Sequence, residues 1–179
     1  RWEAAAEWRI ECLPEVLPAA FVRAVFGNPT GSRLLPGPAE GFIDGRSIGR
    51  IDFPGASADG RAACAFGVDP AIAVHRALEP VRRLAAEGES GYQHRWRYAT
   101  TITLRNRGAT ARAIHLAEAL PISEIETVAV ALDPAGTTEP VDRAPGRVGW
   151  RVRLEPGGER TLTLAYTISM RADADAGGP

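Results

Sequence analysis

The sequence predicts an all-β fold, an antiparallel β-sandwich whose C-terminal half is immunoglobulin-like. Polar and apolar residues alternate strictly over residues 92–105, and similar alternation recurs over residues 148–154 and 162–170. The dipeptide Asp44-Gly45 separates two apolar runs, as in a tight hairpin. Short alternating segments between turn-forming clusters are typical of a β-sandwich.

The N-terminal strands differ in clarity. Residues 9–13 predict a short strand before a proline, and residues 20–26 predict a second strand, with a helix over 19–26 as the alternative. A proline-glycine loop then leads into the hairpin at Asp44-Gly45. Both central positions of a type I′ turn need positive φ, which this dipeptide tolerates, so a second arm is expected as far as residue 53.

The middle of the chain is expected to alternate short strands with loops. Residues 55–62 predict an exposed loop, residues 64–68 a short strand and residues 72–77 another strand. Residues 79–91 contain prolines and glycines and predict a long loop, with a turn or two of helix over 81–87 as the alternative.

The clearest strand covers residues 92–105. Its apolar face carries Tyr92, His94, Trp96, Tyr98, Thr100, Ile102 and Leu104, and its polar face carries Gln93, Arg95, Arg97 and Arg105 among small or hydroxyl residues. This pattern indicates an antiparallel strand with one face in water. A bulge or bend is expected, because a strand rises about 3.4 Å per residue and this one is unusually long.

Further strands are predicted over residues 111–120, 125–132, 148–154 and 162–170. The last two are expected to be the arms of a hairpin closed by a turn at residues 155–159. Their alternation places five side chains between the sheets, namely Trp150, Val152, Leu162, Leu164 and Tyr166.

These elements predict three regions: an N-terminal β subdomain over residues 1–91 that is incomplete at its start, an immunoglobulin-like sandwich half over 92–171, and a flexible tail over 172–179. The chain begins at Arg1 without a methionine or a signal peptide, so we expect it to be a piece of a longer protein.

Composition gives no indication of a nucleic-acid or membrane partner. The net charge is −1 and the isoelectric point about 6.4, so no basic surface is predicted for nucleic acid or anionic lipid. No apolar run approaches the roughly 20 residues of a transmembrane segment. All 21 basic residues are arginine, which fits a GC-rich bacterial genome.

Several patterns resemble reactive sites but have simpler interpretations. Residues 45–49 match the G-x-S-x-G motif, yet Ser47 follows a hairpin turn with no helix after it, so it is expected to be structurally ordinary. The three histidines, His75, His94 and His115, lie on separate predicted strands without metal-ligand spacing. We therefore expect neither metal nor cofactor.

The two cysteines, Cys12 and Cys64, are expected to be buried free thiols. A disulfide between them in an oxidising compartment is the alternative, because the sequence does not give their separation in space.

Arginine provides the candidate binding residues. They are Arg95, Arg97 and Arg105 on one predicted strand face and Arg151 and Arg153 on another. Guanidinium groups bind carboxylates through two parallel hydrogen bonds, so these faces are candidate docking surfaces for a carboxylate-bearing partner or an acidic glycan. The alternative is that they are ordinary wet sheet faces.

The four tryptophans divide into two pairs. Trp96 and Trp150 occupy inward strand positions and are expected in the core, whereas Trp2 and Trp8 lie near the start of the chain. Near Trp2, Trp8 and Ile10 we expect an uncovered sheet edge or apolar groove, through which the chain pairs with itself or with the rest of its parent protein. The alternative is that these residues cover their own edge.

Five segments carry a family resemblance. They are residues 34–39, Asp44-Gly45 with Gly49, residues 66–69, residues 105–107 and residues 120–123. In this order they resemble the C-terminal domain of the mucoidy-inhibitor A family, a domain of unknown function numbered 4139. The resemblance covers most of the chain. The tryptophan-proline-tyrosine and glycine-glutamate-aspartate-tryptophan segments with which the family's domain begins are missing here. It implies a β-rich fold without agreed catalytic residues.

The leading functional hypothesis is a non-enzymatic β-sandwich module that mediates protein contacts in a bacterium, in the periplasm or cell envelope. A carbohydrate-binding module is the first alternative, because aromatic and arginine side chains are available for sugars. An uncharacterised serine hydrolase, which depends on Ser47, is the second.

Overall fold

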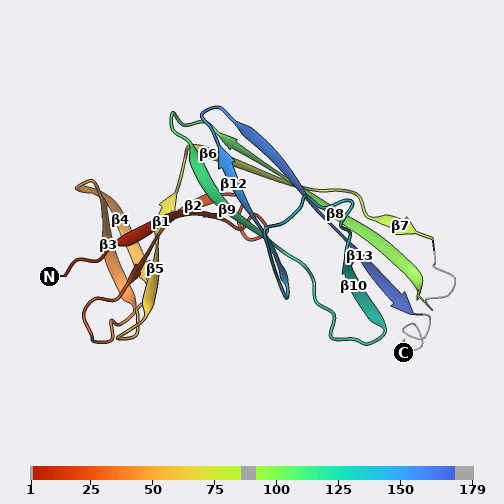
Figure 1. The fold of residues 1–179 in the computed structure, drawn as a ribbon, viewed down its shortest axis with the longest axis horizontal. Coiled ribbons are helices and arrows are strands. Elements are labelled where there is room, and N and C mark those ends of the chain that lie inside the picture. The colour runs from red at the N-terminus through yellow and green to blue at the C-terminus, as the bar shows by residue number, and fades with distance from the viewer. Residues whose placement is uncertain (1, 86–91, 172–179) are drawn as a thin grey trace.

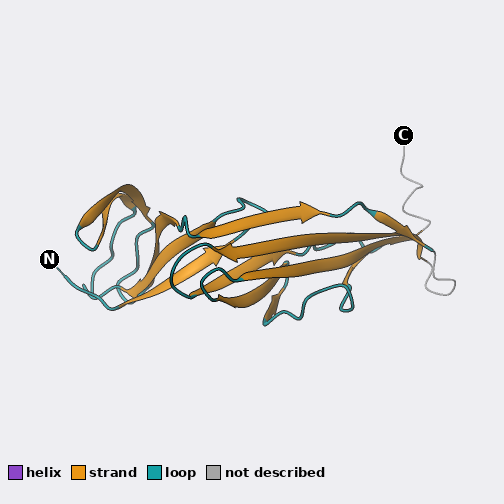
Figure 2. Ribbon diagram, turned by 90° about the horizontal axis from the view of Figure 1, so that it is seen from above, coloured by secondary structure: helices purple, strands orange, loops and turns teal. Residues whose placement is uncertain are grey.

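The computed structural model describes residues 2–85 and 92–171, which form strands, turns and loops without any helix. The molecule is elongated, with the N-terminus at one end and two long strands reaching the other (Figures 1 and 2). Strands are arranged in two large sheets and one separate hairpin. The predicted all-β sandwich is confirmed.

The first large sheet has six strands. In spatial order they are β11 (Asp142–Ala144), β12 (Arg147–Leu154), β9 (Arg112–Ala119), β1 (Ala6–Cys12), β2 (Ala20–Gly27) and β5 (Arg61–Val68). Neighbouring strands are antiparallel except for β1 and β9, which run parallel with Ile10 opposite Ile114. A parallel pair needs a long connection, and here about a hundred residues separate the two strands.

The second large sheet is built on the two longest strands. Its order is β10 (Val128–Leu132), β13 (Glu159–Arg171), β8 (Tyr92–Asn106) and β6 (Ile72–Leu78), and β7 (Arg82–Leu84) pairs with β8 as well. The register between β8 and β13 shifts once, between Met170 and Arg171. The predicted irregularity therefore lies at one end of β8.

The third sheet is the hairpin of β3 (Gly37–Ile43) and β4 (Arg46–Phe53). Ile43 pairs with Arg46, so the loop has two residues. The φ angles of Asp44 and Gly45 are 49° and 75°, which are the positive values that a type I′ turn requires. This confirms the turn predicted from the sequence.

The hydrophobic core lies between the two large sheets. The six-stranded sheet contributes Cys12, Ala20, Ile114, Leu116, Val148, Trp150, Val152 and Leu154, and the facing sheet contributes Ile72, Ile102, Leu104, Leu162 and Leu164. Four of the five side chains predicted between the sheets are thus buried. The fifth, Tyr166, is half-buried at the margin, and Trp96 is also half-buried rather than in the core.

The predicted C-terminal hairpin is wrong. β12 pairs with β9 and β11, whereas β13 pairs with β8 and β10, so the turn between them carries the chain from one sheet to the other. The fully buried Asn106 stabilises the segment that connects the two sheets: its Nδ2 donates to the carbonyl oxygens of Leu154 and Glu155 at 3.2 Å each and of Thr110 at 2.8 Å. Strands β12 and β13 therefore face each other across the core.

Three smaller expectations also change. Residues 20–27 form a strand, so the helical alternative for 19–26 is wrong. Residues 82–84 form β7 instead of part of a helix or loop, and residues 86–91 lie outside the described residues, as does the predicted tail over 172–179. The strand predicted over 125–132 begins only at Val128, whose N–H donates to the Ile125 carbonyl in a turn.

Both large sheets combine strands from before and after residue 91. The six-stranded sheet joins β1, β2 and β5 to β9, β11 and β12, and the second sheet joins β6 and β7 to β8, β10 and β13. The expected boundary at residue 91 therefore does not coincide with a boundary between sheets.

Candidate functional site

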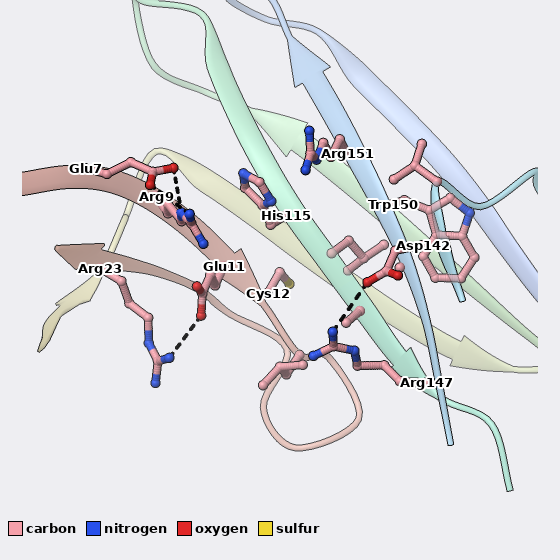
Figure 3. A pocket seen from close by; sticks show the side chains of 15 residues that line it. Glu7, Arg9, Glu11, Cys12, Arg23, His115, Asp142, Arg147, Trp150 and Arg151 are labelled. Carbon is pink, nitrogen blue, oxygen red and sulfur yellow. Dashed lines mark hydrogen bonds and ion pairs between the residues drawn. The ribbon is translucent and has the colours of Figure 1, made fainter. Parts of the chain in front are cut away.

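An open groove with a volume of about 1020 Å³ lies on the outer face of the six-stranded sheet (Figure 3). Seven charged side chains and one histidine line it: Glu7, Arg9, Glu11, Arg23, His115, Asp142, Arg147 and Arg151. We call this hollow the outer groove. Its lining comes from β1, β2, β9, β11 and β12.

Strand alternation explains why charges gather there. Along β1, Ile10 and Cys12 point to the core, so Glu7, Arg9 and Glu11 point to the opposite, outer face. The same alternation on β9 and β12 buries Leu116 and Trp150 and turns their neighbours His115 and Arg151 outward. Pairing of β1 with both β2 and β9 then brings these side chains onto one surface.

Three of the four arginines that line the outer groove form an ion pair with a carboxylate. Arg9 binds Glu7 through two hydrogen bonds of 2.7 Å each, Arg23 lies 3.0 Å from Glu11, and Arg147 lies 3.4 Å from Asp142. The hydrogen bond from Arg9 holds the pKa of the Glu7 carboxyl below its ordinary value. These three arginines are therefore largely neutralised.

Arg151 differs from them. Its side chain is exposed and forms no ion pair or hydrogen bond with any residue that the structure describes. His115 stands directly opposite it on β9, and Glu11 stands opposite His115 on β1. Arg151 also lines a second, smaller hollow of about 190 Å³ beside Glu139, Arg153 and Arg160. It is thus an unpaired guanidinium between two polar hollows.

The five arginines proposed from the sequence do not form one site. Arg95, Arg97 and Arg105 lie on β8 in one sheet, and Arg151 and Arg153 lie on β12 in the other. Arg97 is held by Asp133 at 2.8 Å, and this contact lowers the pKa of that carboxyl. Arg153 is paired with Glu155 at 2.9 Å. Only Arg151 among the five lines the outer groove.

Sequence reasoning missed most of the outer groove. It singled out Arg151, and it considered His115 only as a metal ligand. Alternation within residues 7–11 would have placed Glu7, Arg9 and Glu11 on one face. It would not have placed that face beside His115, because the parallel pairing of β1 with β9 joins segments far apart in sequence.

Ser47 lies on the exposed hairpin. Its hydroxyl donates to Glu40 Oε1 at 3.0 Å and accepts the Gly49 N–H at 3.2 Å. The motif is therefore part of a β-strand rather than the strand-to-helix elbow of a serine hydrolase.

The histidines and cysteines are dispersed. His75, His94 and His115 lie on β6, β8 and β9, and within residues 2–85 and 92–171 no three His, Cys, Asp or Glu side chains gather in a metal-binding group. Cys12 and Cys64 are buried free thiols on β1 and β5, with β2 between them. Burial raises the pKa of Cys12 to about 12 and raises that of Cys64.

Aromatic rings cluster near the N-terminal end. Trp2 is 45% exposed and contacts Phe26 at 5.8 Å between centroids, and Trp8 is 55% exposed and contacts Phe66 edge-on at 5.1 Å. Ile10 is half-buried against the core. Each tryptophan thus packs on a neighbouring strand while leaving much of its ring in solvent.

Together, the fold and the outer groove define an all-β sandwich domain with a charged groove on one outer face. The family model for a domain of unknown function, DUF4139, matches residues 4–171, and the chain belongs to this family. No curated protein and no solved structure matches the chain. No helix among the described residues is long and apolar enough to cross a membrane.

Proposed function

We propose that this domain is a non-enzymatic interaction module that binds a protein partner in the outer groove. The observation that carries the proposal is the groove itself, an open hollow lined by seven charged side chains across several strands of one sheet. Small-molecule sites are mostly enclosed and apolar, which this open groove is not. A protein partner of the groove would be selected by electrostatic complementarity more than by apolar burial. Paired charges along the groove give such a partner a specific pattern to match.

Site-specific photocrosslinking tests this proposal. A photoreactive amino acid replaces Ala117, which lines the outer groove, in the full parent protein within its native cells. The matched control places the same group at Thr161, which is exposed on β13 of the opposite sheet. We expect a discrete protein adduct from position 117 and none from position 161.

The crosslinked partner must then bind in purified form. An Ala117→Glu substitution, which places a bulky charge in the groove, is expected to reduce its affinity at least about tenfold, while Thr161→Glu leaves it unchanged. Equal adducts from both positions, or an unchanged affinity of the Ala117→Glu variant, would reject the outer groove as the binding face.

A carbohydrate-binding module is the second candidate, favoured by the exposed rings of Trp2 and Trp8. Sugars stack on exposed aromatic faces, so if this function is correct the Trp8→Ala variant should no longer bind to a glycan array that retains the wild-type protein.

The exposed surface at Trp2 and Trp8 is also the predicted self-association surface. Sedimentation at rising protein concentration tests this prediction, and a clean monomer would contradict it.

The cellular location and the parent chain are also part of the proposal. We propose that the protein is part of a mucoidy-inhibitor-like parent chain in a bacterial periplasm or cell envelope, and fractionation of native cells tests this location.

The serine-hydrolase alternative predicts labelling of Ser47 by a fluorophosphonate probe. The present proposal predicts no labelling, because Ser47 is held by Glu40 on an exposed strand.

A further inference from the structure

The outer groove contains one cation that is not neutralised. Arg9, Arg23 and Arg147 each have a carboxylate within 3.4 Å, whereas Arg151 has none among the described residues. A guanidinium carries five N–H donors in a fixed fork and binds a carboxylate through two of them. Arg151 therefore presents an unused binding group at the groove surface.

His115 extends this binding group along the sheet. It is half-buried and stands directly opposite Arg151 in the antiparallel register, so their Cβ atoms lie within about 5 Å of each other. Figure 3 shows the imidazole and the guanidinium on the same face of neighbouring strands. An imidazole N–H beside a guanidinium fork provides donors for a carboxylate and for an adjacent acceptor.

We infer that Arg151 and His115 anchor a carboxylate of an acidic peptide segment in the outer groove. The inference deepens the proposed function and rests on it. The groove carries four arginines against three carboxylates, so its formal charge is positive and the excess is located at Arg151. An acidic segment supplies the missing negative charge without breaking an existing pair.

The lining favours a peptide over an acidic glycan. Sugar-binding sites generally offer an exposed aromatic ring, but the aromatic residue lining the groove, Trp150, is 97% buried and its Nε1 donates to the Thr138 carbonyl. The exposed rings of Trp2 and Trp8 are not among the lining residues. What the groove offers is an array of hydrogen-bonding and charged groups spaced along β-strands, which an extended chain can follow.

Calorimetric titration of the 179-residue chain with a hexaglutamate peptide tests the inference, with hexaglutamine as the neutral probe. At low ionic strength, where surface charges are least screened, we expect hexaglutamate to bind and hexaglutamine not to bind. Arg151→Ala should weaken hexaglutamate binding about tenfold or more, and Arg151→Lys should lose part of the affinity because its ammonium has no planar fork.

Arg153→Ala is the matched control. Arg153 lies two residues along the same strand and points to the same face, but it is paired with Glu155 and does not line the outer groove. Its substitution should change the affinity less than about twofold. Both residues are exposed, and circular dichroism of each variant verifies that the fold is retained.

The outcomes separate the inference from the proposed function. No hexaglutamate binding, or equal losses in the Arg151 and Arg153 variants, overturns the acidic-peptide inference even if crosslinking identifies a partner in the groove. Tighter binding of tetragalacturonate than of hexaglutamate, lost in Arg151→Ala, overturns it in favour of a uronic-acid glycan. If hexaglutamate binds and Arg151→Ala weakens that binding, but crosslinking from position 117 yields no partner, the carboxylate site at Arg151 is supported and the proposed function is rejected.

Discussion

At the scale of single residues, Glu118 is the most unusual member of the core. Its carboxylate is buried, with 1% of the side chain exposed, on the inner face of β9. Arg76 on β6 of the facing sheet reaches it with hydrogen bonds of 3.1 and 3.2 Å. The pair therefore ties the two sheets together. Burial still raises the pKa of Glu118, with the Arg76 hydrogen bond opposing it.

The raised pKa of Glu118 predicts a specific pH dependence of stability. Between its ordinary pKa and the raised one, the folded chain keeps a proton that the unfolded chain has lost, so stability falls as pH rises through this window. The free energy of unfolding of the wild type should therefore fall relative to that of Glu118→Gln as pH rises. Urea unfolding of both proteins from about pH 4 to pH 8 measures this. A difference that stays constant with pH would contradict it.

The cysteines provide a second test at this scale. With a pKa of about 12, Cys12 has a thiolate fraction of only about 10⁻⁴ at pH 8, and burial shields Cys64 as well. A chromogenic thiol reagent should therefore not react with the native protein within minutes. After unfolding without reductant, two thiols per chain should react. Rapid native labelling would show that β1 or β5 opens easily, and unfolded chains without free thiols would contain a disulfide.

At the scale of elements, alternation in the sequence was enough to locate most strands and their buried faces. It did not show which strands pair. Residues 148–154 and 162–166 alternate in the same way whether they lie side by side in a hairpin or face each other across a core. The structure has the second arrangement because β12 pairs with β9 and β13 pairs with β8. Such non-local pairing leaves no pattern within either segment.

Asn106 should be important for the crossing between β12 and β13. Asn106→Ala leaves the carbonyl groups of Leu154 and Glu155 without this donor and is expected to cost about 2–3 kcal/mol of unfolding free energy. Arg107→Ala, at the exposed next position, should change stability by less than about 0.5 kcal/mol. Denaturant unfolding measures the free energy of unfolding of the two variants. Equal values for Asn106→Ala and Arg107→Ala would show that Asn106 does not stabilise the connection between β12 and β13.

The hairpin of β3 and β4 should respond locally. Gly45→Val forces a β-branched residue to a φ of 75° and is expected to cost about 1–2 kcal/mol. Because this hairpin is a separate sheet, amide exchange should accelerate in residues 37–53 but not in β8. Asp44→Asn is the control, since asparagine tolerates positive φ. Unchanged exchange in the hairpin would show that the turn does not stabilise it.

At the scale of the whole molecule, the candidate site depends on long-range pairing. Arg151 was identifiable from the sequence as an exposed arginine, but the groove around it exists because β1 enters the sheet between β2 and β9. Its lining residues come from both sides of residue 91. The same pairing joins the two halves of the core, because Cys12, Ala20 and Ile72 pack in one cluster with Leu116 and Leu164.

This shared core predicts that neither half folds alone. A fragment of residues 92–179 would lose β1 and β6 from its two sheets and expose the apolar faces that they cover, and a fragment of residues 1–91 would lack β8, β9 and β12. We expect each purified fragment to show no cooperative unfolding transition, and the two mixed together to regain one at a lower midpoint than the intact chain. Circular dichroism melts and sedimentation of the fragments, separate and mixed, measure this. A cooperative transition in residues 92–179 alone would instead show that the C-terminal half is an independent sandwich to which the N-terminal strands are added.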